Sequence, residues 1–107
     1  YQESIIIMKF ISFLLAANIL FSAPDDPLMK AASAMKAGLY RNALSHVVEA
    51  QNMDQTNPEV FRLKALLHEA LDEPDEALSA WKNCLKHSRD ELLIEEATVH
   101  IQSLTRE

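Results

Sequence analysis

Glycine is almost missing from this sequence: Gly38 is the single one in 107 residues, and there are four prolines. A β-sandwich or barrel needs many more turn-forming residues than this, so an all-β fold is disfavoured. One glycine also excludes a glycine-rich phosphate-binding loop. Because 49% of the residues are hydrophobic, disorder is disfavoured too, and the composition favours long helices.

Cysteine and excess positive charge are also missing. With Cys84 as the only cysteine, one chain can form neither an intramolecular disulfide nor a cysteine-based metal site. Its apolar helical surroundings predict a small buried thiol and not a reactive nucleophile. The 10 Lys and Arg against 16 Asp and Glu leave a net charge of −6, and nucleic-acid partners require a basic face. We therefore expect no nucleic-acid partner.

The polar residues form no constellation typical of an enzyme. Four histidines lie on different predicted helices, without an H-E-x-x-H pattern or an i, i+4 pair: His46, His68, His87 and His100. Acidic pairs gather near predicted helix starts, where negative charge interacts favourably with the helix dipole. We expect no enzyme activity, no cofactor, and no catalytic, cofactor-binding or metal-binding residues.

The N-terminal segment differs from the rest of the chain. A start-type Met8 and Lys9 precede a hydrophobic run from Phe10 to Phe21, followed by small residues and an acidic, proline-containing break. This layout is typical of a secretory signal peptide, so we predict a domain boundary after residues 1–23. The protein is then expected to be exported, to the periplasm or the extracellular space.

Two alternatives to a cleaved signal peptide remain open. Residues 5–23 carry only Lys9 as a charge and are long enough for a marginal membrane anchor. A buried amphipathic role is the other alternative. Residues 1–7 precede Met8, and we interpret them either as a spurious upstream extension from a misplaced start or as the result of a fragment boundary.

The remaining residues, 24–107, repeat with an offset of 34 residues. At that offset similar residues coincide: Pro24 with Pro58, Ala31 with Ala65, Ala43 with Ala77, Leu44 with Leu78, Val47 with Trp81, and Ala50 with Cys84. A period of this length is typical of stacked helical hairpins. The alanines are small where helices cross closely, while Val47 and Trp81 fill the space between repeats.

These residues resemble the tetratricopeptide repeat family. Its half-motif of a turn followed by a second helix is carried by GLYRNALSHVVEA (Gly38–Ala50) and DEPDEALSAWKNCL (Asp72–Leu85), within a resemblance that covers about residues 24–91. Pro27, Lys64 and Pro74 depart from the family pattern. A generic protein of αα-hairpins outside the family is the alternative.

The resemblance implies an all-α fold: a right-handed superhelix of two antiparallel helical hairpins with a closing fifth helix. Repeat one would cover residues 24–57, repeat two 58–91 and the capping helix 92–107. Capping signals and prolines predict helices over residues 27–38, 40–53, 58–72 and 74–87. For the last helix, Ser88 and Glu91 have the spacing of a capping box. This helix is expected to cover Trp81.

In the resembling family the first helices of successive repeats line a concave groove that binds a peptide or a partner helix. The register places eight residues in that groove: Leu28, Ala32, Met35, Lys36, Arg62, Leu66, Glu69 and Ala70. Leu28 and Ala32 stand where chaperone-tail binders need Lys and Asn, so that partner class is not expected. Met35 and Leu66 predict apolar anchoring, although Met35 packing within the domain is an alternative.

The sequence therefore predicts a non-catalytic protein–protein interaction module, exported, as a subunit or assembly factor of an envelope complex. Two repeats make a small core, so homo-oligomerisation or partner binding is expected to supplement its stability. The alternative function is a membrane-anchored structural subunit that retains its N-terminal helix. No arrangement of residues in the sequence supports a hydrolase or a metal enzyme.

Overall fold

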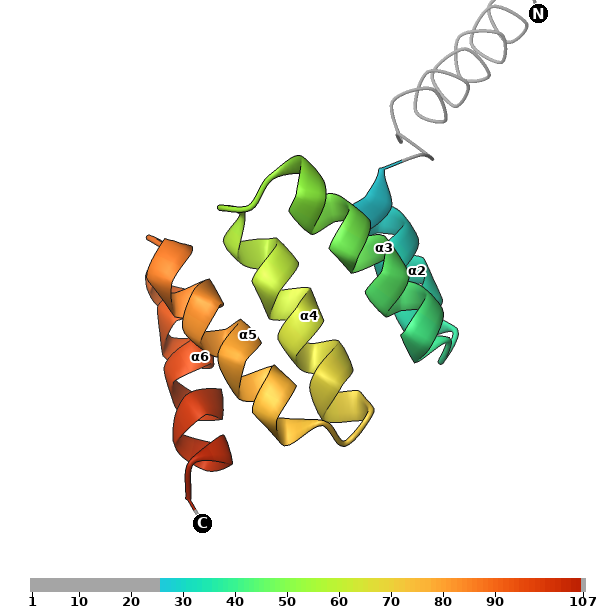
Figure 1. The fold of residues 1–107 in the computed structure, drawn as a ribbon. Coiled ribbons are helices and arrows are strands. Elements are labelled where there is room, and N and C mark those ends of the chain that lie inside the picture. The colour runs from blue at the N-terminus through green and yellow to red at the C-terminus, as the bar shows by residue number, and fades with distance from the viewer. Residues whose placement is uncertain (1–25, 107) are drawn as a thin grey trace, which may run out of the picture.

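The computed structural model describes residues 26–106, which form five α-helices and no strand (Figure 1). The helices are α2 (Pro27–Lys36), α3 (Tyr40–Met53), α4 (Pro58–Ala70), α5 (Pro74–His87) and α6 (Glu91–Leu104). The expected all-α fold class is confirmed. The predicted signal or anchor segment, residues 1–23, lies outside this range, and no helix within 26–106 has the length and apolar character needed to span a membrane.

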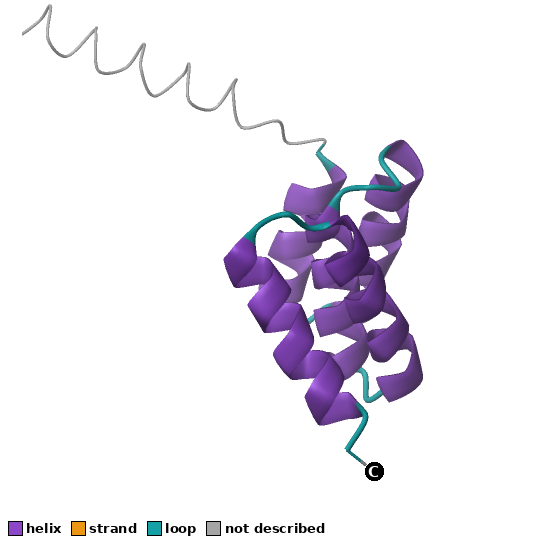
Figure 2. Ribbon diagram, turned by 90° about the vertical axis from the view of Figure 1, so that its left-hand side faces the viewer, coloured by secondary structure: helices purple, strands orange, loops and turns teal. Residues whose placement is uncertain are grey.

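Helices adjacent in sequence pack against each other along a row from α2 to α6. The α2–α3 and α4–α5 pairs form two antiparallel hairpins, α6 packs on α5, and α2 also contacts α4 (Figure 1). Short loops make all the connections between these helices (Figure 2): residues 37–39, 54–57, 71–73 and 88–90. Because loops of this length join antiparallel neighbours, the row follows directly from where the helices start and stop.

Two helix starts have a side-chain cap directly before a proline. The Asp26 carboxylate accepts a hydrogen bond from the Leu28 N–H at 3.0 Å, and α2 then begins at a proline. The Asn57 side chain accepts one from the Glu59 N–H at 3.0 Å before α4. Each cap satisfies one of the backbone donors left free in the first helical turn.

The capping box expected for the last helix is wrong. Asp90 is the N-cap of α6, since its carboxylate accepts from the Leu92 N–H at 3.0 Å. Ser88 instead ends α5, where its own N–H donates to the Cys84 carbonyl. The Ser88 hydroxyl accepts a hydrogen bond from the Asp90 N–H at 3.2 Å, but α6 begins at Glu91, two residues later than a Ser88 cap would place it.

Two helices end two residues earlier than expected, α2 at Lys36 and α4 at Ala70, because the next turns take a left-handed residue. Gly38 has φ of +78° and Asp72, 34 residues later, has φ of +56°. Glycine adopts this conformation without a steric penalty, whereas an aspartate is strained by it.

The two turns share their hydrogen bonds as well as their left-handed residues. The Leu39 N–H donates to the Ala34 carbonyl at 2.9 Å, and the Glu73 N–H donates to the His68 carbonyl at 2.8 Å. Both bonds have the 6→1 pattern of a Schellman motif. The 34-residue offset therefore holds for the backbone of the turns and not only for the side chains.

The core consists of two hydrophobic clusters that share α4. The first joins α2, α3 and α4: Ala31, Ala43, Val47, Ala50, Val60 and Leu67. The second joins α4, α5 and α6: Phe61, Ala65, Ala80, Trp81, Cys84, Leu93 and Ala97. Trp81 is fully buried, as expected for a closing helix that covers it. Because α4 contributes to both clusters, each hairpin depends on the other for part of its core.

Candidate functional site

The groove residues predicted on α2 are mostly engaged within the domain. Leu28 and Met35 are half-buried and pack against the α2–α3–α4 cluster, so the alternative interpretation of Met35 as a packing residue is confirmed. Ala32 is half-buried, and Lys36 is exposed. Of the four predicted groove residues on α2, only Lys36 is therefore exposed.

On α4, Arg62 forms an ion pair with the closing helix. Its Nε donates to the two carboxylate oxygens of Glu96 at 2.9 and 3.1 Å. This hydrogen bond raises the pKa of the Arg62 guanidinium, against the smaller opposing effect of burial. Leu66 packs against the α4–α5–α6 cluster, while Ala70 is exposed. Arg62 and Leu66 therefore both contribute to holding the last hairpin and α6 together.

Glu69 links three helices through a single carboxylate oxygen. The Trp81 indole Nε1 donates to Glu69 Oε2 at 2.7 Å, and His100 Nδ1 lies 2.8 Å from the same oxygen. The Trp81 and His100 rings stack at 4.3 Å between centroids, with 26° between their planes. Six of the eight predicted groove residues are half-buried. The charged groups of Arg62 and Glu69 already form contacts within the chain. The groove stays a prediction.

A cleft of about 390 Å³ lies between α3 and α5, with α4 as its floor. It is lined by Leu44, Val48, Phe61, Lys64, His68, Glu76, Ser79, Ala80 and Asn83. The apolar part comes from Phe61, which is buried, and from Val48, which remains 41% exposed on α3. Lys64 donates to the Gln51 side chain at 3.0 Å, so it reaches back toward α3 at the cleft's edge.

The sequence analysis missed this cleft. Three helices form it, and its width depends on how far α3 and α5 stand apart, which no pattern within one helix records. The available signal was Val48, an apolar residue on the polar side of an amphipathic helix. A second signal was His68, which follows Phe61 and Ala65 at helical spacing on the apolar side of its helix. In the structure it is 8% exposed and lies inside the domain.

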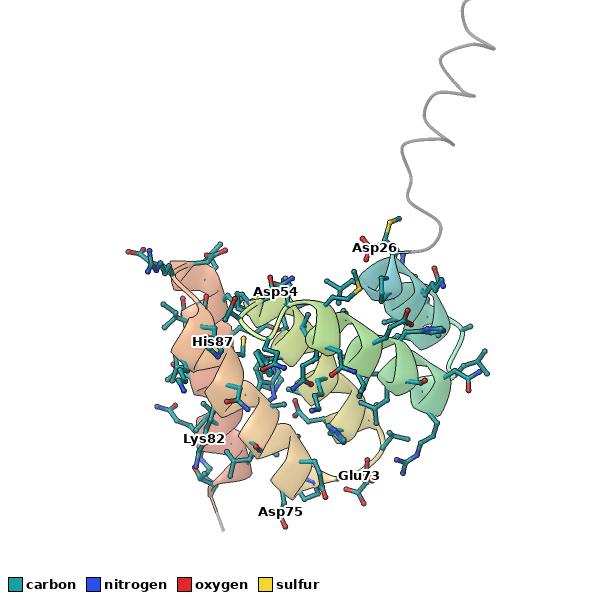
Figure 3. The ribbon with its side chains drawn as sticks, turned by 45° about the horizontal axis from the view of Figure 1, so that its top comes forward. Asp26, Asp54, Glu73, Asp75, Lys82 and His87 are labelled. Atoms are coloured by element: carbon teal, nitrogen blue, oxygen red, sulfur yellow. The ribbon has the colours of Figure 1, made fainter. Side chains whose placement is uncertain are left out.

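His68 connects the cleft to a polar network at the α4–α5 turn, where Glu73 lies (Figure 3). Its Nδ1 lies 3.1 Å from Glu73 Oε1, and Arg41 Nη2 of α3 donates to Glu73 Oε2, also at 3.1 Å. The hydrogen bond with His68, and then that with Arg41, lowers the pKa of the Glu73 carboxyl below its ordinary value. The ionised Glu73 carboxylate therefore links α3 to the second hairpin.

This network predicts a specific dependence of stability on pH. Because the native pKa of Glu73 is lowered, its contribution is fully present above its ordinary value of 4.5 and is lost as pH falls through the lowered value. Glu73→Gln is expected to lower the melting temperature at pH 7 and to remove part of the loss that the wild type shows below pH 4.5. Thermal unfolding followed by circular dichroism from pH 7 to pH 3 measures both effects.

The matched control is Glu76→Gln, which removes one acidic charge from an exposed site on α5. It is expected to leave the acid-induced loss close to that of the wild type. Equal melting temperatures for Glu73→Gln and the wild type at every pH would contradict the role of Glu73.

Cys84 is a buried structural thiol, as predicted. Its side chain is fully buried in the α4–α5–α6 cluster, and burial raises its pKa to about 11. It is therefore protonated at neutral pH and inert as a nucleophile. Within residues 26–106 no group of three or more His, Cys, Asp or Glu side chains is arranged to hold a metal ion.

Comparison of the chain with protein-family models, with curated proteins and with solved structures finds no match. The functional argument therefore depends on the chain's own residues and surfaces.

Proposed function

We propose that this chain is a non-catalytic interaction module of tetratricopeptide type, a right-handed superhelix of two repeats that binds a protein or peptide partner. The repeat proposal is supported by the backbone: α3 and α5 both have 14 residues, and their bounds differ by 34. The left-handed turns at Gly38 and Asp72 have the same offset and the same hydrogen bonds. Scaffolds of this kind present surfaces for recognition without reactive groups.

The cleft between α3 and α5 is the observation that carries the binding proposal. Its lining combines apolar side chains from α3, α4 and α5 with a base (Lys64), an acid (Glu76) and an amide (Asn83). Binding sites typically combine an apolar interior with a few polar groups that orient the ligand. We propose that the cleft binds an apolar side chain from a helical or extended segment of the partner. Polar residues of the partner on either side of it then contact Lys64 and Glu76, which carry opposite charges.

The predicted groove on α2 and α4 is the competing surface. Because Arg62 and Glu69 are paired with groups on α5 and α6, a partner would have to replace contacts that already stabilise the fold. In the cleft, Val48 is exposed, and burying its apolar surface under a partner is favourable. The cleft is therefore favoured over the groove.

One set of variants tests the two surfaces. The partner is first identified by crosslinking in the native host, and its affinity for purified variants is then measured by calorimetry. Val48→Arg places a charge in the cleft and is expected to weaken binding at least about tenfold, because an apolar anchor loses its site. Met53→Arg is the matched control, since Met53 lies on the same helix and is 74% exposed.

Ala70→Arg tests the groove in the same assay, because Ala70 is its exposed residue on α4. Weakening by Ala70→Arg with no effect of Val48→Arg would move the binding site to the groove. Unchanged affinity in both variants would overturn the proposal for both surfaces.

We also propose that the protein is exported, on the basis of the apolar run from Phe10 to Phe21. The intact mass of the mature protein in the soluble and membrane fractions tests this. A soluble species that starts near residue 23 or 24 supports export, and a full-length species in the membrane fraction supports the anchored subunit instead.

A further inference from the structure

The row of helices ends in two faces on which no other helix of residues 26–106 packs: one on α2 and one on α6 (Figure 1). On α6, Leu92 is 77% and Val99 is 57% exposed, and Glu95 lies between them. Their spacing of i, i+3 and i+7 places all three on one side of the helix. The side of α6 that faces away from the core is thus an apolar stripe with an acidic centre.

The outer side of α2 has the opposite charge. Met29 is 48% exposed there, and Lys36, seven residues later, lies on the same side and is also exposed. α2 contains two lysines, Lys30 and Lys36, and no acidic residue. One exposed apolar side chain (Met29) and one exposed base (Lys36) are therefore available at this end, and Lys30 is half-buried.

The charges of the two end helices are complementary. α6 contains Glu91, Glu95 and Glu96 and no lysine or arginine. Only Glu96 is used within residues 26–106, in the ion pair with Arg62 of α4; Glu91, Glu95 and the two lysines of α2 form no ion pair in that range.

We propose that the chain associates with itself head to tail, with α6 of one copy against α2 of the next. Leu92 and Val99 then cover Met29, while Glu95 lies near Lys36. The two contacting surfaces differ, so the interface is heterologous and each copy keeps one free end. Association therefore continues beyond a dimer and extends the row of helices.

The interface is weak and depends on ionic strength. Three exposed apolar side chains bury less than the roughly 1,000 Å² expected of a stable interface, so the concentration of protein controls assembly. The ion pairs lie at its exposed edge, where salt at about 0.15 M already screens charges beyond about 8 Å. This association goes beyond partner binding in the cleft and does not require it, because the cleft lies on α3, α4 and α5.

Sedimentation equilibrium of the full chain at rising protein concentration and low salt tests the proposal. The weight-average mass is expected to rise past that of a dimer and to fall when salt is added. Lys36→Glu and Glu95→Lys each place like charges across the interface and are expected to weaken association at least about tenfold. Asp75→Lys, an outward-pointing change on α5 (Figure 3), is the matched control and is expected to leave association unchanged.

A mixture of the two charge variants separates this proposal from other forms of self-association. Glu95 of the Lys36→Glu chain meets Lys36 of the Glu95→Lys chain, so an equimolar mixture is expected to regain the association that each variant lacks alone. Circular dichroism checks that each variant keeps its helices. A wild type that stays monomeric at every concentration, or a Lys36→Glu variant that associates like the wild type, would overturn the proposal.

Discussion

Trp81→Ala is expected to unfold most of the domain at ambient temperature. The indole is fully buried at the centre of the α4–α5–α6 cluster. Truncating a buried tryptophan to alanine removes about 3–5 kcal/mol from the free energy of unfolding, close to the entire stability of a small domain. The change also removes the donor to Glu69 and the ring that stacks on His100. Urea unfolding followed by far-UV circular dichroism measures the loss.

Trp81→Phe is the matched control for the role of the indole N–H. It keeps most of the apolar volume and removes the hydrogen bond to Glu69, which still has His100 within 2.8 Å. The expected loss is therefore smaller, about 1–3 kcal/mol. An alanine variant with the urea midpoint of the wild type would show that α6 does not depend on this side chain.

Gly38→Ala is expected to lower the free energy of unfolding by about 1–2 kcal/mol, because a side chain is strained at a positive φ. A Cβ at this position would meet no atom within 4 Å, so the loss comes from the backbone conformation and not from a clash. Asp72→Gly is expected to raise the free energy of unfolding, since Asp72 occupies a left-handed conformation with φ of +56° that glycine adopts without strain. Its gain should be below about 1 kcal/mol, because glycine also gains entropy in the unfolded chain.

Asp72→Ala is the control for this pair of variants. It removes the same carboxylate as Asp72→Gly but leaves a Cβ at the left-handed position, so it should not stabilise the protein. Thermal unfolding of all three variants under one set of conditions gives the comparison. Equal melting temperatures for Asp72→Gly and Asp72→Ala would mean that the backbone conformation is not the cause.

The sequence predicted the number, type and order of these five helices because the signals that start and stop a helix are local. Asp26 and Asn57 cap the helices that follow them through a backbone N–H only two residues away. The predicted starts at prolines 27, 58 and 74 are confirmed for the same reason. The prediction failed at Ser88, where two helix ends compete for one short linker and Asp90 takes the cap.

The surfaces were less predictable, because the partner of a long side chain depends on helices that are distant in sequence. Repeat register alone placed Arg62 and Glu69 in an open groove. In the folded chain Arg62 meets Glu96, 34 residues away, and Glu69 meets Trp81, 12 residues away. The cleft was missed because α3 and α5 form it together over α4.

The sequence by itself determined an all-helical chain with a 34-residue period, small residues at helix crossings and a buried Cys84. Each of these depends on hydrogen bonds within one helical turn or on the spacing of apolar residues along one helix. Only the tertiary structure decided that Glu69 holds Trp81 and His100, that Asp72 takes a left-handed conformation, and that a cleft opens beside Val48. These features depend on how neighbouring helices are spaced and rotated, and side-chain packing between helices sets that arrangement.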